Sequence, residues 1–230
     1  MSRRGSRSWQ METSPSPTRT NKRVQVFNEH YEFKFEFATC EPPYAIASDR
    51  EFNIVVSTTR RTVEVYRRGG KLLHAFPIGG LSKGFTGFHI TLNNKDEVIV
   101  SDPRDCKIKF FSYTGTLLYR FEPIANAEGL TVMPSGVLRT PTDQIIVADS
   151  LNHTVNQYTE RGILLKQLLC PTDDIGTVQA CALGPEGHLI TLEYSILGQH
   201  SMKIFRYRSC ECHESRPNSS RRRTPTPQIE

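Results

Sequence analysis

The chain has 230 residues, of which 37% are hydrophobic and 9% aromatic, and its formal net charge is +5. This length is enough for one large domain with its own apolar core. A membrane-spanning helix needs about 18 consecutive apolar residues, and no stretch of the sequence comes close to this length. No apolar signal region follows Met1. We therefore expect no membrane partner and a cytoplasmic location.

The two ends differ in composition from the middle of the chain. Residues 1–20 and 209–230 are rich in Ser, Pro and Arg and are predicted to be disordered tails. These tails carry net charges of +3 and +1, whereas the residues from 21 to 208 carry only +1. The composition therefore excludes a uniformly cationic domain that coats nucleic acid, while a local basic patch stays open.

The middle of the chain repeats itself in steps of about 45 residues. Pairs of Leu residues begin at Leu72, Leu117 and Leu164, at spacings of 45 and 47 residues. Each pair follows an apolar run, a polar turn, an alternating segment and a turn that contains Gly. Because the apolar runs are short, β-branched and bounded by turn-forming residues, they predict strands rather than helices. Small antiparallel sheets of this kind bury their faces by stacking radially, as the blades of a β-propeller do.

In chain order, the pattern predicts an all-β fold with three full blades and two partial ones. A partial blade is expected at 22–37, full blades at about 43–77, 88–122 and 130–169, and a second partial blade at 178–207, together forming an incomplete β-propeller over 21–208. We call the four strands of a blade A to D in chain order. The expected A strands lie at 44–47, 89–92, 130–132 and 179–183, and the first partial blade has only strands C and D. Ile54, Ile99 and Ile146 are predicted at equivalent positions of strand B, between the blades. A fragment of a larger propeller and a small open propeller both fit this pattern.

Three segments preserve the pattern best. They are IIVADSLNHTVNQYTERG at 145–162, VSDPRDCKIKFFSYTG at 100–115 and VSTTRRTVEVYRRGG at 56–70, the last without the Asp. In their strand-B hydrophobic residues, turn residues and closing Gly, these segments resemble the NHL-repeat family, in which six blades are usual. The chain is similar to the C-terminal NHL domain of RING and tripartite-motif NHL proteins.

The resemblance implies a binding module rather than an enzyme. It implies that the propeller recognises a protein partner or ubiquitination substrate for a RING-type E3 ubiquitin ligase, upstream of proteasomal degradation. No RING, B-box or coiled-coil pattern occurs in the sequence, so the ligase chemistry would need a domain that this chain lacks. The alternative function is that of a post-transcriptional regulator that binds single-stranded RNA.

Few residues point to catalysis or to metal binding. Cys210, Cys212 and His213 are too close together for one tetrahedral zinc site, and the remaining cysteines are scattered as reduced thiols would be. Asp102 and Asp149 occupy equivalent positions, which favours turn capping over catalysis. We therefore expect no catalytic residue, no metal ligand and no small-molecule cofactor.

The clearest functional signal is the position of basic residues in the turns. In a four-stranded blade, the B–C turns and the D–A links emerge on one face, and the A–B and C–D turns emerge on the other. The candidate binding residues on the first face are Arg60, Arg61, Lys83, Arg104, Lys107, Asn152 and His153, with Phe85 and Phe88 close by. Such side chains can bind an acidic protein segment, or phosphates and bases of RNA, or can simply be solvated. His153 is expected to stabilise its turn rather than to act as a general base.

Overall fold

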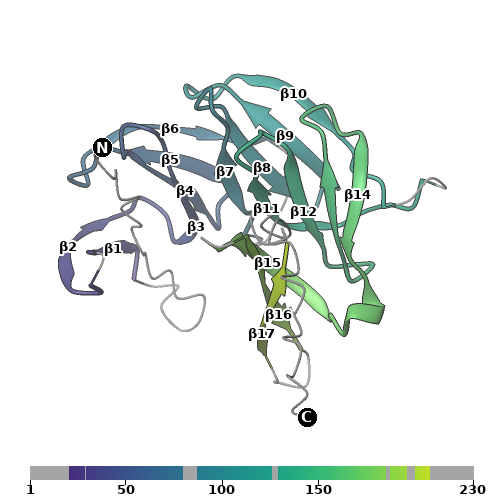
Figure 1. The fold of residues 1–230 in the computed structure, drawn as a ribbon. Helices are drawn as coiled ribbons and strands as arrows, with labels where there is room; N and C mark the ends of the chain where they lie inside the picture. The colour runs from purple at the N-terminus through teal and green to yellow at the C-terminus, as the bar shows by residue number, and fades with distance from the viewer. Residues whose placement is uncertain are drawn as a thin grey trace, which may run out of the picture.

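The incomplete β-propeller predicted from the repeats is present in a computed structural model of the chain, which describes residues 21–28, 30–79, 87–125, 129–184, 187–195 and 200–207. Five small antiparallel sheets account for the strands, and they follow one another along an arc (Figure 1). Within the described ranges, no helix is long and apolar enough to cross a membrane.

The arc begins with a hairpin and ends with a three-stranded sheet. The hairpin consists of β1 (Arg23–Phe27) and β2 (Phe33–Ala38). Blade 1 consists of β3 (Pro43–Ser48), β4 (Ile54–Thr58), β5 (Thr62–Tyr66) and β6 (Leu72–Pro77). Blade 2 consists of β7 (Ile90–Leu92), β8 (Val98–Asp102), β9 (Lys107–Phe111) and β10 (Leu117–Phe121). Blade 3 consists of β11 (Pro134–Arg139), β12 (Ile145–Asp149), β13 (Thr154–Tyr158) and β14 (Leu164–Leu169). After the short 3-10 helix η2 (Pro171–Asp173), the last blade consists of β15 (Thr177–Leu183), β16 (His188–Tyr194) and β17 (Ser201–Arg206).

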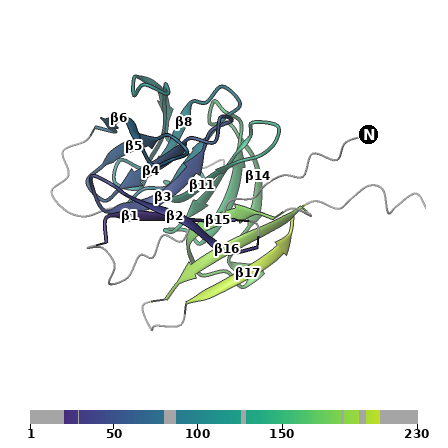
Figure 2. The same ribbon diagram turned by 90° about the vertical axis from the view of Figure 1, so that its left-hand side faces the viewer.

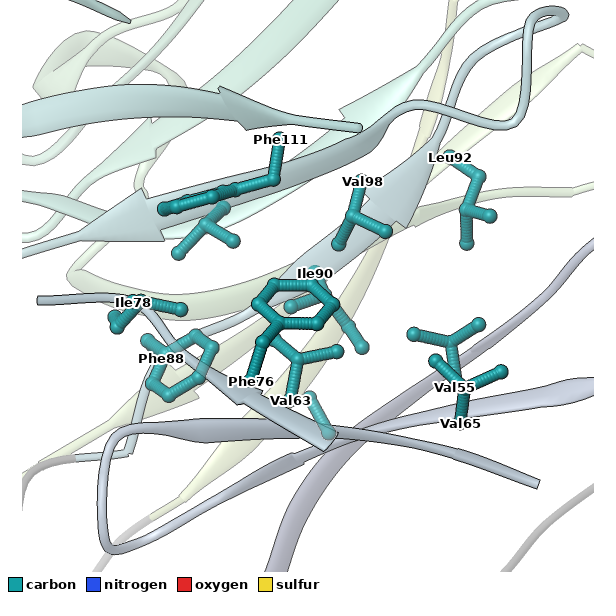
Figure 3. Packing of buried hydrophobic residues seen from close by; sticks show 12 residues of the cluster. Val55, Val63, Val65, Phe76, Ile78, Phe88, Ile90, Leu92, Val98 and Phe111 are labelled. Atoms are coloured by element: carbon teal, nitrogen blue, oxygen red, sulfur yellow. The ribbon is translucent and has the colours of Figure 1, made fainter. Parts of the chain in front are cut away.

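The apolar core lies between neighbouring sheets. Val55 and Val65 of blade 1 face Val98 and Phe111 of blade 2, and all four are buried (Figure 3). Similar clusters lie between the hairpin and blade 1, between blades 2 and 3, and between blade 3 and the last blade. Because burying one such side chain contributes about 1.5–3 kcal/mol, each sheet depends on its neighbours for stability.

The first strand of blade 3 begins later than the sequence predicted. The expected strand at 130–132 is not part of the sheet: Thr131 forms an isolated bridge with Ile124 instead, and Val132 is buried between blades 2 and 3. The ladder with β12 begins at Pro134, which lies opposite Asp149. The residues from 130 to 132 therefore close the link between blades 2 and 3: Val132 is buried, whereas Leu130 and Thr131 are exposed.

The predicted equivalence of Ile54, Ile99 and Ile146 is wrong by one residue in blade 1. All three are buried between sheets, but the pairing register makes Val55, not Ile54, the counterpart of Ile99. The cause is the turn between β4 and β5 (59–61), which is one residue shorter than the turn between β8 and β9 (103–106). A shift of one residue moves a side chain to the other face of its strand, so Ile54 packs against the hairpin instead.

Candidate functional site

The turns divide between two faces as the sequence predicted. On one face, the Arg61 guanidinium in a B–C turn donates to the carbonyl of Gly79 in a D–A link (Nη2–O 2.8 Å). On the other face, the Tyr113 hydroxyl in a C–D turn donates to Asp49 in an A–B turn (2.6 Å). We call the first surface the B–C face; it is formed by the turns 59–61, 103–106 and 150–153 and by the D–A links beside them.

A buried ion cluster joins blades 1 and 2 at the B–C face. The Asp102 side chain is 0% exposed and lies at the end of β8. Its Oδ2 accepts hydrogen bonds from Arg61 Nη2 and from Lys109 Nζ, both at 2.6 Å. Lys109 also contacts Asp105 at 2.5 Å. Because the side chains of Arg61 and Lys109 are only 9% and 4% exposed, Arg61 holds two blades together and is not a side chain that a partner could reach.

Sequence reasoning missed this cluster, although its signal was present. A polar side chain recurs at the third position of strand C as Glu64, Lys109, Asn156 and Lys203, and in three of the four strands both neighbours are apolar. Lys109 and Lys203 contact carboxylates of the neighbouring strand, Asp102 and Glu193. Glu64 accepts the backbone N–H groups of Cys40 and Glu41. A charged residue inside an alternating strand indicates a buried partner, because an unpaired buried charge is too costly to retain.

The partners of Asp102 determine the direction of its pKa shift. Burial by itself would raise the pKa of Asp102, but the hydrogen bonds and charges of Arg61 and Lys109 outweigh burial and hold the pKa below its ordinary value. The carboxylate is therefore ionised throughout the physiological range, and the cluster is an ion pair rather than a proton-transfer site.

We expect acid to weaken the contact between blades 1 and 2. A depressed pKa in the folded state means that the stabilisation is present above the unfolded-state pKa of about 3.9 and is lost as the pH falls through the folded-state value. Urea unfolding from about pH 7 down to about pH 2 would compare the wild type with Asp102→Asn, whose side chain carries no charge. The stability difference should shrink as the pH falls, and a difference independent of pH would contradict the assignment.

Two further cations of the B–C face, Arg60 and Lys107, pair with carboxylates. Arg60 is exposed and pairs with Glu41 at 3.1 Å. Lys107 pairs with Glu122 at 3.0 Å. The Arg104 side chain is exposed, and its backbone N–H donates to Asp102 (3.2 Å), which fixes the position of the turn. The structure therefore brings Arg60, Arg104 and Lys107 to the predicted surface, within a mixed rather than uniformly basic environment.

Asn152 stabilises the B–C turn of blade 3, in which His153 also lies. Asn152 Nδ2 donates to the carbonyl of Thr131 (2.8 Å) and to Asp149 Oδ2 (2.5 Å). Asp149 Oδ1 in turn accepts the backbone N–H of Asn152 (3.3 Å), so the predicted capping role of Asp149 is confirmed. His153 has a left-handed backbone (φ 53°), and its Nδ1 lies 3.4 Å from Thr177 Oγ1 of the last blade.

Several other candidates are not available to a ligand or are not described. Phe88 is buried between blades 1 and 2, so it cannot stack on a base. Lys83 and Phe85 lie outside the described residues, as do Cys210, Cys212 and His213. Among the residues that the structure describes, no group of three or more His, Cys, Asp or Glu side chains could hold a metal ion.

Comparison with known proteins shows the fold. No protein-family model matches the chain, and no curated protein matches it. Among solved structures, the virginiamycin B lyase from Staphylococcus aureus is similar with a TM-score of 0.56 and 14% identity, over 80% of this chain and 64% of that chain. A streptogramin B lyase is similar with a TM-score of 0.58 and 12% identity, over 86% of this chain and 68% of that chain. The WD40 β-propeller domain of Doa1 is similar with a TM-score of 0.54 and 16% identity, over 74% of this chain and 54% of that chain. The chain thus spans less than two thirds of the length of the virginiamycin B lyase and of the WD40 domain. Sequence identities this low show a shared fold but not a shared activity. The fold that these proteins share with this chain is the β-propeller.

Proposed function

We propose that the chain is a protein-binding propeller module and that the B–C face is its recognition surface. The observation that carries the proposal is the mixed charge of this face. One exposed cation and two partly buried cations lie beside carboxylates in three pairs, which are Arg60 with Glu41, Lys107 with Glu122 and Lys203 with Asp174. A surface that binds a phosphate backbone needs a clear positive excess, whereas a protein interface uses charges of both signs at its rim. The mixed charge therefore favours a protein partner over RNA.

The ion cluster supports this role because it makes the surface rigid. Arg60 is adjacent to Arg61, and Arg104 follows Asp102 by two residues, so both exposed side chains start from turns that the buried cluster fixes. A preorganised surface loses less conformational entropy when it binds. Arg60 and Arg104 thus project from turns that do not need to rearrange on binding.

We further propose that the module is of the NHL type and holds the substrate of a RING-type ubiquitin ligase. The support is the shared register of hydrophobic residues, turn residues and closing Gly in the segments 56–70, 100–115 and 145–162. In this proposal the side chains of the chain bind and orient the substrate, and ubiquitin transfer takes place on a RING domain that these residues do not supply.

We expect charge reversal on the B–C face to weaken binding without unfolding the protein. The variant Arg60→Glu with Arg104→Glu changes two exposed side chains and leaves the buried Arg61 intact. The purified full chain would be used to select ligands from a proteomic peptide display library, and binding of the selected peptides would be measured alongside poly(U) RNA. The association rate of the peptides should fall about tenfold in the variant, because rim charges act mainly through electrostatic steering.

A matched control lies on the opposite face. Arg67→Glu with Arg161→Glu changes the net charge equally, but these residues belong to C–D turns. Circular dichroism would establish that both variants fold. An equal loss of peptide binding in both variants would mean that only the net charge matters, and it would disprove the assignment of binding to the B–C face. Binding of poly(U) with a steep salt dependence, and no selected peptide, would favour the RNA alternative.

A further inference from the structure

An aromatic side chain with an unusual backbone conformation lies at the end of blade 1 that is opposite the B–C face. The strands β3 to β6 lie side by side in this blade, and the A–B turn joins β3 to β4 (Figure 2). Within this turn, Phe52 has φ 64°, a left-handed conformation that bulky residues rarely adopt. The equivalent positions of the other blades hold Asp96, Asp143 and Gly187, which are residue types that tolerate this conformation.

Packing does not explain why Phe occupies this position. The Phe52 side chain is 45% exposed, so burial offsets only part of the backbone strain. In blades 2 and 3 the acidic residue links two blades: Asp96 accepts a hydrogen bond from Arg50 (2.6 Å), and Asp143 accepts one from Asn94 (2.8 Å). A phenyl ring cannot form such a link. A strained and exposed aromatic residue indicates a role outside the fold.

The C–D turn beside Phe52 concentrates positive charge. Its three cations are exposed; they are Arg67, Arg68 and Lys71. The backbone N–H of Arg67 donates to the carbonyl of Lys71 (2.8 Å), so these side chains leave one tight turn. The Arg68 guanidinium lies 5.9 Å from the centre of the Phe52 ring. We call Phe52, Arg67, Arg68 and Lys71 the blade 1 corner.

The charge of the corner differs from the charge of its surroundings. The C–D turns of blades 2 and 3, at 112–116 and 159–163, carry no net charge. Among the described residues, no carboxylate lies within ion-pair distance of Arg67 or Lys71, whereas cations of the B–C face are paired. The exposed Glu51 lies in the neighbouring A–B turn, but the cations of the corner outnumber it. The corner therefore fits a negatively charged partner.

We propose that the blade 1 corner binds the surface of an anionic lipid bilayer. Its residues lie on two turns at the edge of a sheet, and turns can touch a flat surface, whereas a single nucleic-acid strand is held along a groove. Cations are attracted to anionic headgroups, and an exposed aromatic ring inserts at the boundary between headgroups and acyl chains. Such peripheral contact needs no membrane-spanning helix.

This inference is independent of the proposed function. The A–B and C–D turns emerge on the face opposite the B–C turns, as the contact of Tyr113 with Asp49 shows. A bilayer at the blade 1 corner therefore leaves the B–C face accessible to a protein partner. Either proposal can fail without the other, because their residues lie on different turns.

Co-sedimentation of the full chain with vesicles tests the proposal. We expect binding to phosphatidylcholine vesicles that contain phosphatidylserine, and little binding to pure phosphatidylcholine. Arg67→Glu with Lys71→Glu should weaken binding at least about tenfold, because two attractive charges become repulsive at the anionic surface. The basic tails are the same in every variant, so a difference between variants is due to the substituted residues.

A matched control changes the net charge equally elsewhere. Arg120→Glu with Lys166→Glu alters exposed side chains on the fourth strands of blades 2 and 3. Binding should stay within about twofold of the wild type, because charges farther than a Debye length from the bilayer are screened. Equal losses in the two charge-reversal variants would mean that only the net charge matters, and they would overturn the proposal.

A second variant separates binding from folding. Phe52→Asn removes the ring without changing the net charge, and Asn adopts the left-handed conformation more readily than Phe. We expect a thermal unfolding temperature no lower than that of the wild type. Vesicle binding should weaken about fivefold, because the exposed half of the ring no longer enters the bilayer interface. Unchanged vesicle binding by this variant would contradict the role of the ring and overturn the proposal.

The remaining outcomes identify other occupants of the corner. Equal binding to both kinds of vesicle would overturn the proposal. Poly(Glu) or poly(U) that binds in place of the vesicles, and is lost from Arg67→Glu with Lys71→Glu, would assign the corner to an acidic protein segment or to RNA instead. Circular dichroism would check folding, and if that variant does not fold, Arg67→Gln with Lys71→Gln replaces it.

Discussion

Asp102→Ala is expected to lower the free energy of unfolding by about 3 kcal/mol, near the lower end of the range for breaking a buried ion pair. The substitution removes the carboxylate between Arg61 and Lys109 and leaves both cations buried. Lys109 keeps Asp105 and Arg61 keeps the carbonyl of Gly79, so the loss is smaller than for cations without any other partner. Equilibrium unfolding in urea would measure the change.

The exposed ion pair between the same two blades is the matched control. Arg50 in the A–B turn of blade 1 contacts Asp96 in the A–B turn of blade 2 at 2.6 Å, and the Arg50 side chain is largely exposed. Because solvent screens such a pair, Arg50→Ala should change stability little. Similar losses for Asp102→Ala and Arg50→Ala would mean that burial does not set the strength of the Asp102 cluster.

The fold was predictable because the signal for it is local. An apolar run, a turn and an alternating segment define a strand pair wherever they occur, and their repetition defines a stack of sheets. Spacing is a weaker guide than pattern. The average period aligns Ile54 with Ile99, but the shorter turn at 59–61 shifts the register by one residue.

The site was predictable only in part, because burial depends on the neighbouring blade. Strand count alone places Arg60 and Arg61 in the same turn on the same face. Whether each is exposed depends on what the next blade presents, and Asp102 is far away in sequence from Arg61. Adjacent arginines therefore have different roles: Arg60 is exposed on the surface, and Arg61 crosses to blade 2. The amino-acid composition does not distinguish these two roles. Lys109 does indicate a buried partner, because it is a charged residue inside the strand β9.

The second large effect on stability is expected from substituting the closing Gly of a repeat. Gly115 lies in the C–D turn of blade 2 with φ +95°, a backbone conformation that residues with a Cβ rarely adopt. A Cβ at this position would also lie within 2.5 Å of the Phe76 Cβ, which belongs to blade 1. Phe76 is buried between the blades and packs against Phe111 with ring centroids 5.7 Å apart, so its ring has no free space to enter. Gly70 and Gly162 meet Phe37 and Phe121 in the same way, which explains why this Gly closes all three repeats.

Gly115→Ala is therefore expected to destabilise the protein by about 3 kcal/mol, from about 1–2 kcal/mol of left-handed backbone strain and about 1–3 kcal/mol of overpacking. Gly79→Ala separates the two contributions, because Gly79 has φ +75° but nothing within 4 Å of the added Cβ. It should lose only the backbone part, about 1 kcal/mol. Urea unfolding of both variants would measure the difference. Equal losses would show that backbone conformation alone requires the Gly, whereas a larger loss at Gly115 would show that the closing Gly also sets how closely one blade approaches the next.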